Sequence, residues 1–341
     1  MRSFRTFFSA LALVALAACG GGSGGGTVPP AASDPGTRDP SGSSIVFERA
    51  TLWVAYDAVI HAYSTDGNGA VTPKETLPRF MWPTPKGVDN PGITDIAIAP
   101  DGTQYVLENR DFALGGRGWR LFTVAPGETE PEHVNGDDVS RPFAVGIAGD
   151  GIMVGLYGPN GETTIATFPY GASNAPPIRT FTSTSRMLAF AEGNDSKLYV
   201  ARPNGVDVYL PTSDGSSPLR SIATGALPSH VTIGPHEFAV GPNNSIYVVD
   251  LPGNHTNPVM YVNVYAPRSG ALVRRIGPLP ADYGGFGFPV ITVDAKNRLY
   301  VATNGHIYRF GPTANGTAAP QRDMIDPAFG RARALAIGPK L

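Results

Sequence analysis

Six copies of one short segment constrain the fold of this chain more than any other feature of its sequence. Each copy is a β-branched and aromatic run around a central valine, and the six valines fall at positions 54, 106, 154, 200, 248 and 301. The copies are TLWVAY, TQYVLE, GIMVGL, KLYVAR, SIYVVD and RLYVAT. Their spacings of 52, 48, 46, 48 and 53 residues indicate a repeat protein, in which each period is one supersecondary unit.

Three further strands are predicted in each period. An apolar strand that ends in a turn precedes five of the copies, as in FAVGIAGDG and EFAVGPNN. A strand, a turn and another strand follow every copy, as in VDVYLPTSDGSSPLRSI. The 42 Gly and 33 Pro residues are spread along the chain, which favours short strands over long helices. Four short strands in a period of about 50 residues are typical of a β-propeller blade.

The first copy has no strand upstream of it, and the missing strand is found at the other end of the chain. The segment ALAIGPK (334–340) has the pattern of the strand that precedes the other five copies. We therefore predict an all-β fold, a six-bladed β-propeller closed by a C-terminal innermost strand that pairs with three N-terminal strands from residues 51–77. Closure of this kind removes the open edge of the ring and ties down both ends of the domain.

The repeat text resembles that of NHL-type and related bacterial six-bladed propellers, the SMP-30-like ones included, over essentially the whole domain. It reads as an apolar strand and turn, then IYV or LYV, then VYxP, a turn and RxI. That superfamily contains binding modules, sugar lactonases and lyases. The resemblance therefore implies the fold and leaves the function open.

The N-terminus has the pattern of a bacterial lipoprotein signal. Arg2 and Arg5 precede an apolar run, Phe7 to Ala18, which is too short to span a bilayer and is typical of a cleaved signal peptide. The run ends in LAAC, which resembles a lipobox, and Cys19 is the only cysteine of the chain. The resemblance implies cleavage before Cys19, its acylation with palmitate, and an anchor in the outer membrane. The alternative is an ordinary signal peptide with an incidental cysteine.

The chain is thus predicted to have three parts: a signal peptide (1–18), the acylated cysteine with a Gly/Pro/Ser-rich tether (19–44), and the propeller (45–341). The formal net charge of −2 argues against nucleic acid as a partner. We expect a protein of the bacterial cell envelope whose partners are the membrane, through the N-terminal lipid, and an envelope protein or glycan.

Residues 64–75 partly match the calcium-binding loop of an EF-hand. Asp66, Asn68 and Glu75 fall at loop positions 3, 5 and 12, but Ser64 replaces the aspartate of position 1. The other five repeats have a plain turn at this place, and DGNG between two strands is a common hairpin turn. A hairpin is therefore predicted, with calcium binding as the alternative.

Function in a propeller concentrates where the connections after the second strands meet the connections that enter the innermost strands. Loops after the second strands supply the candidates Glu108, Asn109, Arg110, Asp111, Asp250, His255 and Asn304. Loops before the innermost strands supply the candidates Arg141, Arg186, His236 and Arg333. Asp250 and Asn304 have the alternative of capping strand ends, and the arginines have the alternative of pairing with carboxylates.

No catalytic motif accompanies these residues. The chain has no Gly-x-Ser-x-Gly or Walker sequence, and His236-Glu237 lacks the second histidine of a zinc-protease motif. We therefore predict a binding module for a protein, peptide or glycan, without a cofactor, although its status as an enzyme stays open. The family resemblance implies one alternative, a lactonase-like hydrolase or lyase that holds calcium at the channel mouth with Glu108, Asp250 and Asn304. This chain does not match the family's motif residue by residue. A structural assembly factor is the third possibility.

Overall fold

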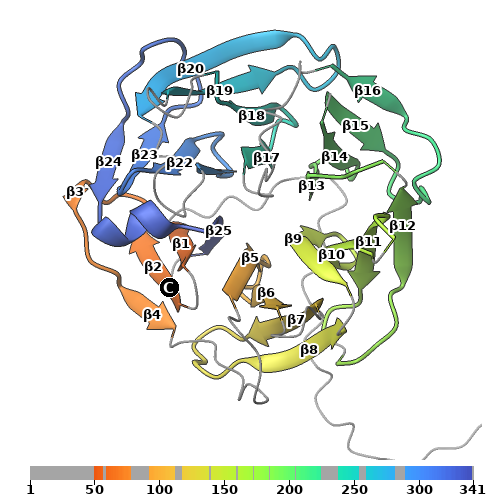
Figure 1. Ribbon diagram of the computed structural model, residues 1–341. Coiled ribbons are helices and arrows are strands. Elements are labelled where there is room, and N and C mark those ends of the chain that lie inside the picture. The colour runs from red at the N-terminus through yellow and green to blue at the C-terminus, as the bar shows by residue number, and fades with distance from the viewer. Residues whose placement is uncertain are drawn as a thin grey trace, which may run out of the picture. The chain divides into compact units, whose positions relative to one another are not determined.

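The computed structural model describes residues 50–56, 59–77, 92–111, 117–137, 140–158, 160–171, 173–183, 185–203, 205–223, 237–252, 259–280 and 289–339. Its 25 strands form six sheets, which are the blades of a six-bladed β-propeller (Figure 1). This confirms the predicted fold class. The predicted signal peptide, Cys19 and the tether lie outside the described residues. Within those residues, no helix has the length and hydropathy needed to cross a membrane.

Each blade has four strands, ordered from the innermost to the outermost. Blade 1 contains β25 (Ala334–Pro339), β1 (Ala50–Tyr56), β2 (Val59–Ser64) and β4 (Glu75–Leu77). Blade 2 contains β5 (Gly92–Ile98), β6 (Gln104–Asp111), β7 (Arg117–Val124) and β8 (Glu132–Asp137). Blade 3 contains β9 (Arg141–Ala148), β10 (Gly151–Tyr157), β11 (Thr163–Phe168) and β12 (Arg179–Ser183).

Blade 4 contains β13 (Ala189–Glu192), β14 (Leu198–Arg202), β15 (Gly205–Tyr209) and β16 (Arg220–Ile222). Blade 5 contains β17 (Phe238–Val240), β18 (Ile246–Asp250), β19 (Val259–Tyr265) and β20 (Leu272–Pro280). Blade 6 contains β21 (Val290–Val293), β22 (Leu299–Thr303), β23 (His306–Phe310) and β24 (Arg322–Ile325). The short strand β3 (Gly69–Ala70) joins blade 6 as a fifth strand, and the 3₁₀ helix η2 (Pro327–Arg331) precedes β25.

The six repeated runs form the second strands of the blades. In β14 and β18 the first four residues are buried, and in β22 all five are. A blade is covered on both faces by its neighbours, so its inner strands need apolar residues on both sides. This is why the copies read as continuous apolar runs instead of alternating with polar residues.

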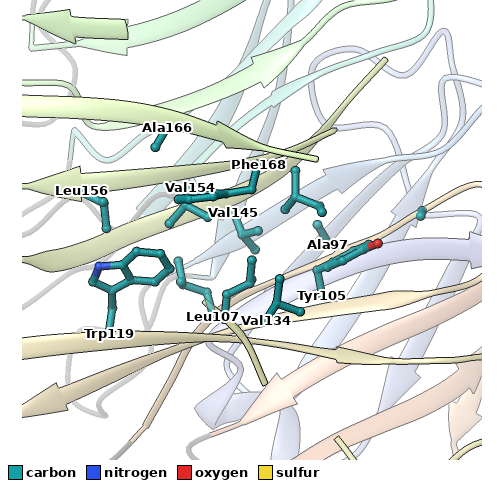
Figure 2. Close-up of a cluster of buried hydrophobic side chains, with 13 residues drawn as sticks. Ala97, Tyr105, Leu107, Trp119, Val134, Val145, Val154, Leu156, Ala166 and Phe168 are labelled. Carbon is teal, nitrogen blue, oxygen red and sulfur yellow. The ribbon is translucent and has the colours of Figure 1, made fainter. Parts of the chain in front are cut away.

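The core is divided among the interfaces between adjacent blades, and the described residues form one buried apolar cluster at each of the six interfaces. Between blades 2 and 3, Leu107 and Trp119 share a cluster with Val145, Val154 and Phe168 (Figure 2). The rings of Trp119 and Phe168 are 6.0 Å apart between centroids. Stability is therefore spread around the ring, and each blade depends on both neighbours.

The ring closes as the sequence predicts. β25 pairs antiparallel with β1, with Leu335 opposite Val54 and Ile337 opposite Leu52. Leu335 is buried and belongs to the same apolar cluster as Val290 of blade 6. Ile337 is partly buried and packs against this cluster. The C-terminal strand thus belongs to the same sheet as the first strands of the domain and contributes to its core.

The turns between third and fourth strands reach back to the outermost strand of the preceding blade. The N–H of Gly277 in blade 5 donates to the Gly316 carbonyl of blade 6 (3.0 Å), and the N–H of Thr182 in blade 3 donates to the Asp214 carbonyl of blade 4 (3.0 Å). β3 pairs in parallel with β24 in the same way. These contacts cover part of the open edge that an outermost strand presents.

Residues 64–75 form the connection of a hairpin, because β2 pairs antiparallel with β4 and strands flank the segment on both sides. Arg309 Nη1 of blade 6 donates to the Thr65 carbonyl (2.6 Å) and to Asp66 Oδ1 (3.0 Å). Asn68 Oδ1 accepts from the Asp323 N–H (3.0 Å). The hydrogen bond from Arg309 lowers the pKa of Asp66. The predicted hairpin is confirmed, and its acidic and amide side chains connect blade 1 to blade 6.

Candidate functional site

The two ends of the blades differ in how their strands are connected. At one end, the connections between first and second strands hold two or five residues, as between Ala148 and Gly151 or between Ile98 and Gln104. We call this end, which also carries the third-to-fourth turns, the turn face. At the other end the lengths range from two residues to fifteen, the longest being residues 223–237. We call this end the loop face, and the predicted site residues that the structure describes lie at it.

The four candidates of blade 2 belong to a strand, so their prediction as loop residues was wrong. β6 runs to Asp111 and pairs with β7 along its whole length, up to Asp111 opposite Arg117. Glu108 is 2% exposed and stands opposite Ile93 of β5. The hairpin extends through this polar segment because its register continues unbroken from the apolar part. The side chains of Arg110 and Asp111 lie outside the described part of the structure.

Asp250 has a structural role, but through contacts with side chains of neighbouring strands and not through the strand capping that the sequence suggested. Its Oδ2 accepts from Arg275 Nη2 (2.9 Å) and from Asn263 Nδ2 (3.3 Å), so it ties β18 to β19 and β20. The guanidinium of Arg275 also lies 3.8 Å from the centre of the Tyr261 ring. These contacts hold the loop-face end of blade 5 together.

Asn304 likewise has a backbone role. It forms, with Gly305, the two-residue connection between β22 and β23, and both have positive φ, 50° and 79°. A two-residue hairpin with positive φ at both positions is a type I′ turn, for which Asn-Gly is the preferred sequence. The side chain of Asn304 is exposed.

The candidates at the entries to the innermost strands are spread over the ring. Arg141 and Arg186 are exposed, and the N–H of Arg333 donates to the Ala55 carbonyl (2.8 Å), which fixes the start of β25. His236 and His255 lie outside the described residues. The structure therefore does not bring the described candidates together into one cluster.

The residues suggested for a calcium site do not fit a shared site. Glu108 belongs to blade 2 and Asp250 to blade 5, and these blades lie on opposite sides of the ring (Figure 1). Asp250 is also occupied by Arg275. No three His, Cys, Asp or Glu side chains gather closely enough to hold a metal in the part of the chain that the structure describes.

A polar network at the loop face of blade 1 was not predicted. The hydroxyl of Tyr63 donates to Asp326 Oδ2 (2.8 Å) and lies 3.1 Å from both the Tyr56 hydroxyl and His61 Nδ1. Burial raises the pKa of both tyrosines and lowers that of His61. Asp326 also accepts from the Ala328 N–H (2.9 Å) and so begins helix η2. The network fixes the connection that leads into the closing strand.

The repeat contained a signal for this network. A polar residue two positions before a tyrosine recurs in the third strands, as Asp207 before Tyr209 and Asn263 before Tyr265. In blade 4, Arg202 donates to Asp207 Oδ2 (2.5 Å) and to the Tyr209 hydroxyl (2.7 Å). Because equivalent positions tie second strands to third strands in several blades, we interpret these networks as part of the framework.

Two buried carboxyl groups at the innermost strands were also missed. Burial raises the pKa of Asp95 in β5 to about 7, although its carboxylate accepts from the N–H groups of Val145 and Ile96, each at 2.8 Å. Glu237, directly before β17, is 4% exposed, and burial raises its pKa to about 8. Perturbed carboxyl groups of this kind are candidates for functional residues. An alignment of the six innermost strands would have shown that both acids occupy the same position, which is apolar in the other four blades.

A small crevice lies apart from these residues, on the turn face between blades 3 and 4. Its lining is mostly apolar and includes Phe181 and Leu210. The two charged residues in the lining already have partners: Arg179 pairs with Asp150 (3.0 Å), and Glu192 Oε2 accepts from the Gly149 N–H (3.0 Å). The two charged groups that line the crevice are thus already used within the framework.

Comparison with known proteins supports the fold and nothing finer. No family model matches the sequence, and no curated protein matches it. A chain of a nidogen–laminin complex superposes with a TM-score of 0.54 at 14% identity, covering 84% of this chain and 98% of that one. A Bacteroides caccae protein of unknown function gives 0.54 at 12% identity, with 85% and 99% covered. A Bacteroides uniformis protein provisionally described as a 6-phosphogluconolactonase gives 0.53 at 10% identity, with 85% and 99% covered. At these identities the likeness extends to the propeller architecture alone.

Proposed function

We propose that this chain is a lipid-anchored β-propeller of the bacterial cell envelope that binds a protein, peptide or glycan ligand on its loop face. The contrast between the two faces carries the proposal. On the turn face the connections between first and second strands hold only two or five residues, whereas the connections on the loop face hold two to fifteen and differ from blade to blade. Variable connections on a rigid scaffold are the usual place of a binding site in such folds.

A lactonase-like hydrolase remains the second candidate only through the resemblance of the repeats and the provisional name of one structural neighbour. Against it, Glu108 and Asp250 stand in opposite blades, and Asp250 pairs with Arg275. A binding role requires no such convergence of metal ligands, so the geometry favours it.

The binding role is tested by cross-linking the protein to its envelope partners in cells and identifying them by mass spectrometry. In one variant a Gly/Ser linker of equal length replaces residues 78–91, which follow β4 and precede β5 in the sequence, and the flanking strand ends Leu77 and Gly92 lie at the loop face. In the matched turn-face variant Leu210 and Leu219, 50% and 53% exposed, become serine. We expect the partner with the wild type and the turn-face variant, and its loss with the loop-face variant. Equal recovery from all three would contradict the proposal, and lactone hydrolysis by the purified protein would favour the enzyme.

The lipid anchor has its own test. Cys19→Ser removes the sulfur that acylation needs, so the variant is expected in the soluble fraction after cell breakage. Membrane association that still requires detergent for release would rule out the anchor at Cys19.

A further inference from the structure

Glu237 occupies a position that the fold fills differently in the other blades. In the other five blades the strand register defines the equivalent residue. In the innermost strand, one residue pairs with the central valine of the second strand, and the equivalent residue stands one position before it. The equivalents are Asp95, Ala144, Ala189, Val290 and Ala334. Phe238 is the partner of Val248, so Glu237 is the sixth member. Since alanine or valine suffices in four blades, the fold does not need a carboxyl group here.

The equivalent residues also show where the side chain of Glu237 lies. Ala189 of blade 4 shares a buried cluster with Phe238 of blade 5, and Val290 of blade 6 shares one with Leu335 of blade 1. Asp95 of blade 2 likewise accepts from Val145 of blade 3. Each faces the blade that follows it. The equivalence therefore places Glu237 between blades 5 and 6, at the loop-face end of an interface that contains Val249, Leu251 and Ile291.

Asp95 and Glu237, the two acidic residues among the six equivalent positions, differ in one respect. Asp95 has two backbone N–H donors, which explain its burial within the framework. The side-chain Oε2 of Glu237 is buried and has no hydrogen-bond partner among the described residues. Native proteins leave few buried polar groups without partners, and each one calls for an explanation. A partner that comes from outside the chain would supply it.

We propose that Glu237 is the anchor for a lysine-like or arginine-like side chain of a protein or peptide ligand. This deepens the proposed binding function and rests on it. A buried carboxylate gains most from a cationic nitrogen, because the pair neutralises the buried charge and forms a charge-assisted hydrogen bond. Val249, Leu251 and Ile291 belong to the buried apolar cluster of the same interface, and in surroundings of low polarity the attraction between a cation and a carboxylate is strengthened. A cationic nitrogen thus fits both the carboxyl group and its surroundings.

The probe for the experiment is n-butylammonium chloride, which reproduces the end of a lysine side chain, with n-butanol as its uncharged isostere. Binding to the purified protein is measured by calorimetry from pH 6 to pH 9 at constant ionic strength. We expect butylammonium to bind, butanol not to bind, and the affinity to rise with pH, because only the ionised carboxyl group of Glu237 attracts the cation. Glu237→Gln should weaken binding by about tenfold to a hundredfold, the range for a hydrogen bond to a charged group.

Glu162→Gln is the matched control. It removes a carboxylate from the same face, where Glu162 Oε2 accepts only from the Asn160 N–H (3.1 Å) among the described groups, and it should leave butylammonium binding unchanged. Equal weakening by both variants would mean a general charge effect and would overturn the proposal. So would calcium or magnesium binding that displaces butylammonium at Glu237.

The stability of Glu237→Gln separates a ligand anchor from a framework residue. The variant should melt at or above the temperature of the wild type, because it removes a buried carboxyl group whose Oε2 has no hydrogen-bond partner among the described residues. A marked loss of stability, or failure to fold, would show that the fold needs the carboxyl group and would refute the inference. If envelope partners cross-link equally to the wild type and to Glu237→Gln, the anchor fails while the binding function stands. If no partner cross-links at all, the binding function fails.

Discussion

The turn face and the loop face are built from the same six repeats, yet the turns between first and second strands on the turn face repeat their geometry more closely than the connections on the loop face. In four blades the turn between first and second strands has one residue with positive φ at the same place: Gly102, Ser196, Asn244 and Asn297. In each of these turns an Asp or Asn side chain accepts from a backbone N–H two residues later, as Asp101 does from Thr103 (2.8 Å) and Asp294 from Lys296 (2.9 Å). On the loop face neither the connections from second to third strands nor those from fourth to first strands keep one length in more than three blades. The repetition thus marks what the fold requires, and its absence marks where the chain is free to acquire a binding function.

The largest expected effect comes from breaking the framework at its closure. Deletion of Arg333 to Leu341 removes β25, which pairs with β1 through six residues. Burial of Leu335 stabilises the fold by roughly 1.5–3 kcal/mol, the partly buried Ile337 contributes less, and the loss of the strand exposes an apolar edge of β1. Against a total stability of roughly 5–15 kcal/mol, the domain should unfold or aggregate, as measured by circular dichroism and gel filtration.

A milder variant shows whether the side-chain packing of β25 or its backbone pairing with β1 is responsible for the loss of stability. Leu335→Ser with Ile337→Ser keeps the backbone ladder and removes the apolar contacts, so it should fold with lower stability. A truncated chain that stays monomeric with the melting temperature of the wild type would disprove closure through β25.

The connection between blades 6 and 1 should give the next largest effect. Arg309 is 5% exposed and donates to Thr65 and Asp66 on the turn face. Arg309→Ala removes hydrogen bonds of a charged group, worth about 1.5–3 kcal/mol, measured by urea unfolding. The loop-face control Arg141→Ala changes an exposed side chain and should stay within about 0.5 kcal/mol of the wild type. Equal losses of unfolding free energy in the two variants would contradict the distinction between the framework and the loop face.

The sequence predicted the framework well because the framework repeats. Period, blade number and closure by ALAIGPK follow from apolar patterns that recur around the ring, and the hairpin at residues 64–75 follows from comparison with the other copies. The site could not be found in the same way, since a binding face departs from the repeat. Polar residues after a copy were taken as loops, yet in blade 2 the β6 strand continues through them to Asp111. Glu237 was passed over because it was judged as part of a zinc motif and not as one member of a column.

The pH dependence of stability compares the two acids of that column. The folded state raises the pKa of Asp95 to about 7 and that of Glu237 to about 8, from ordinary values near 4. The folded protein therefore holds protons on these two groups that the unfolded chain has lost, so their contribution to stability is complete below about pH 4 and is lost as the pH rises to about 8. Urea unfolding from pH 5 to pH 9 should show this decline, and Glu237→Gln should make it shallower. A stability that rises over this range would contradict the burial of both acids in uncharged form.

The smallest expected effect is that of calcium on the turn face. If residues 64–75 held calcium, a concentration one hundred times the dissociation constant would stabilise the fold by about 2.7 kcal/mol. Asp66 and Asn68 instead accept hydrogen bonds from blade 6, so millimolar calcium should leave the melting temperature unchanged. Asp66→Ala should lower that temperature slightly in the presence and absence of calcium alike, because it removes a partner of Arg309. An increase with calcium that Asp66→Ala abolishes would make the turn face a ligand site and end its contrast with the loop face. An increase that persists in the variant would place a calcium site elsewhere in the chain and leave the contrast intact.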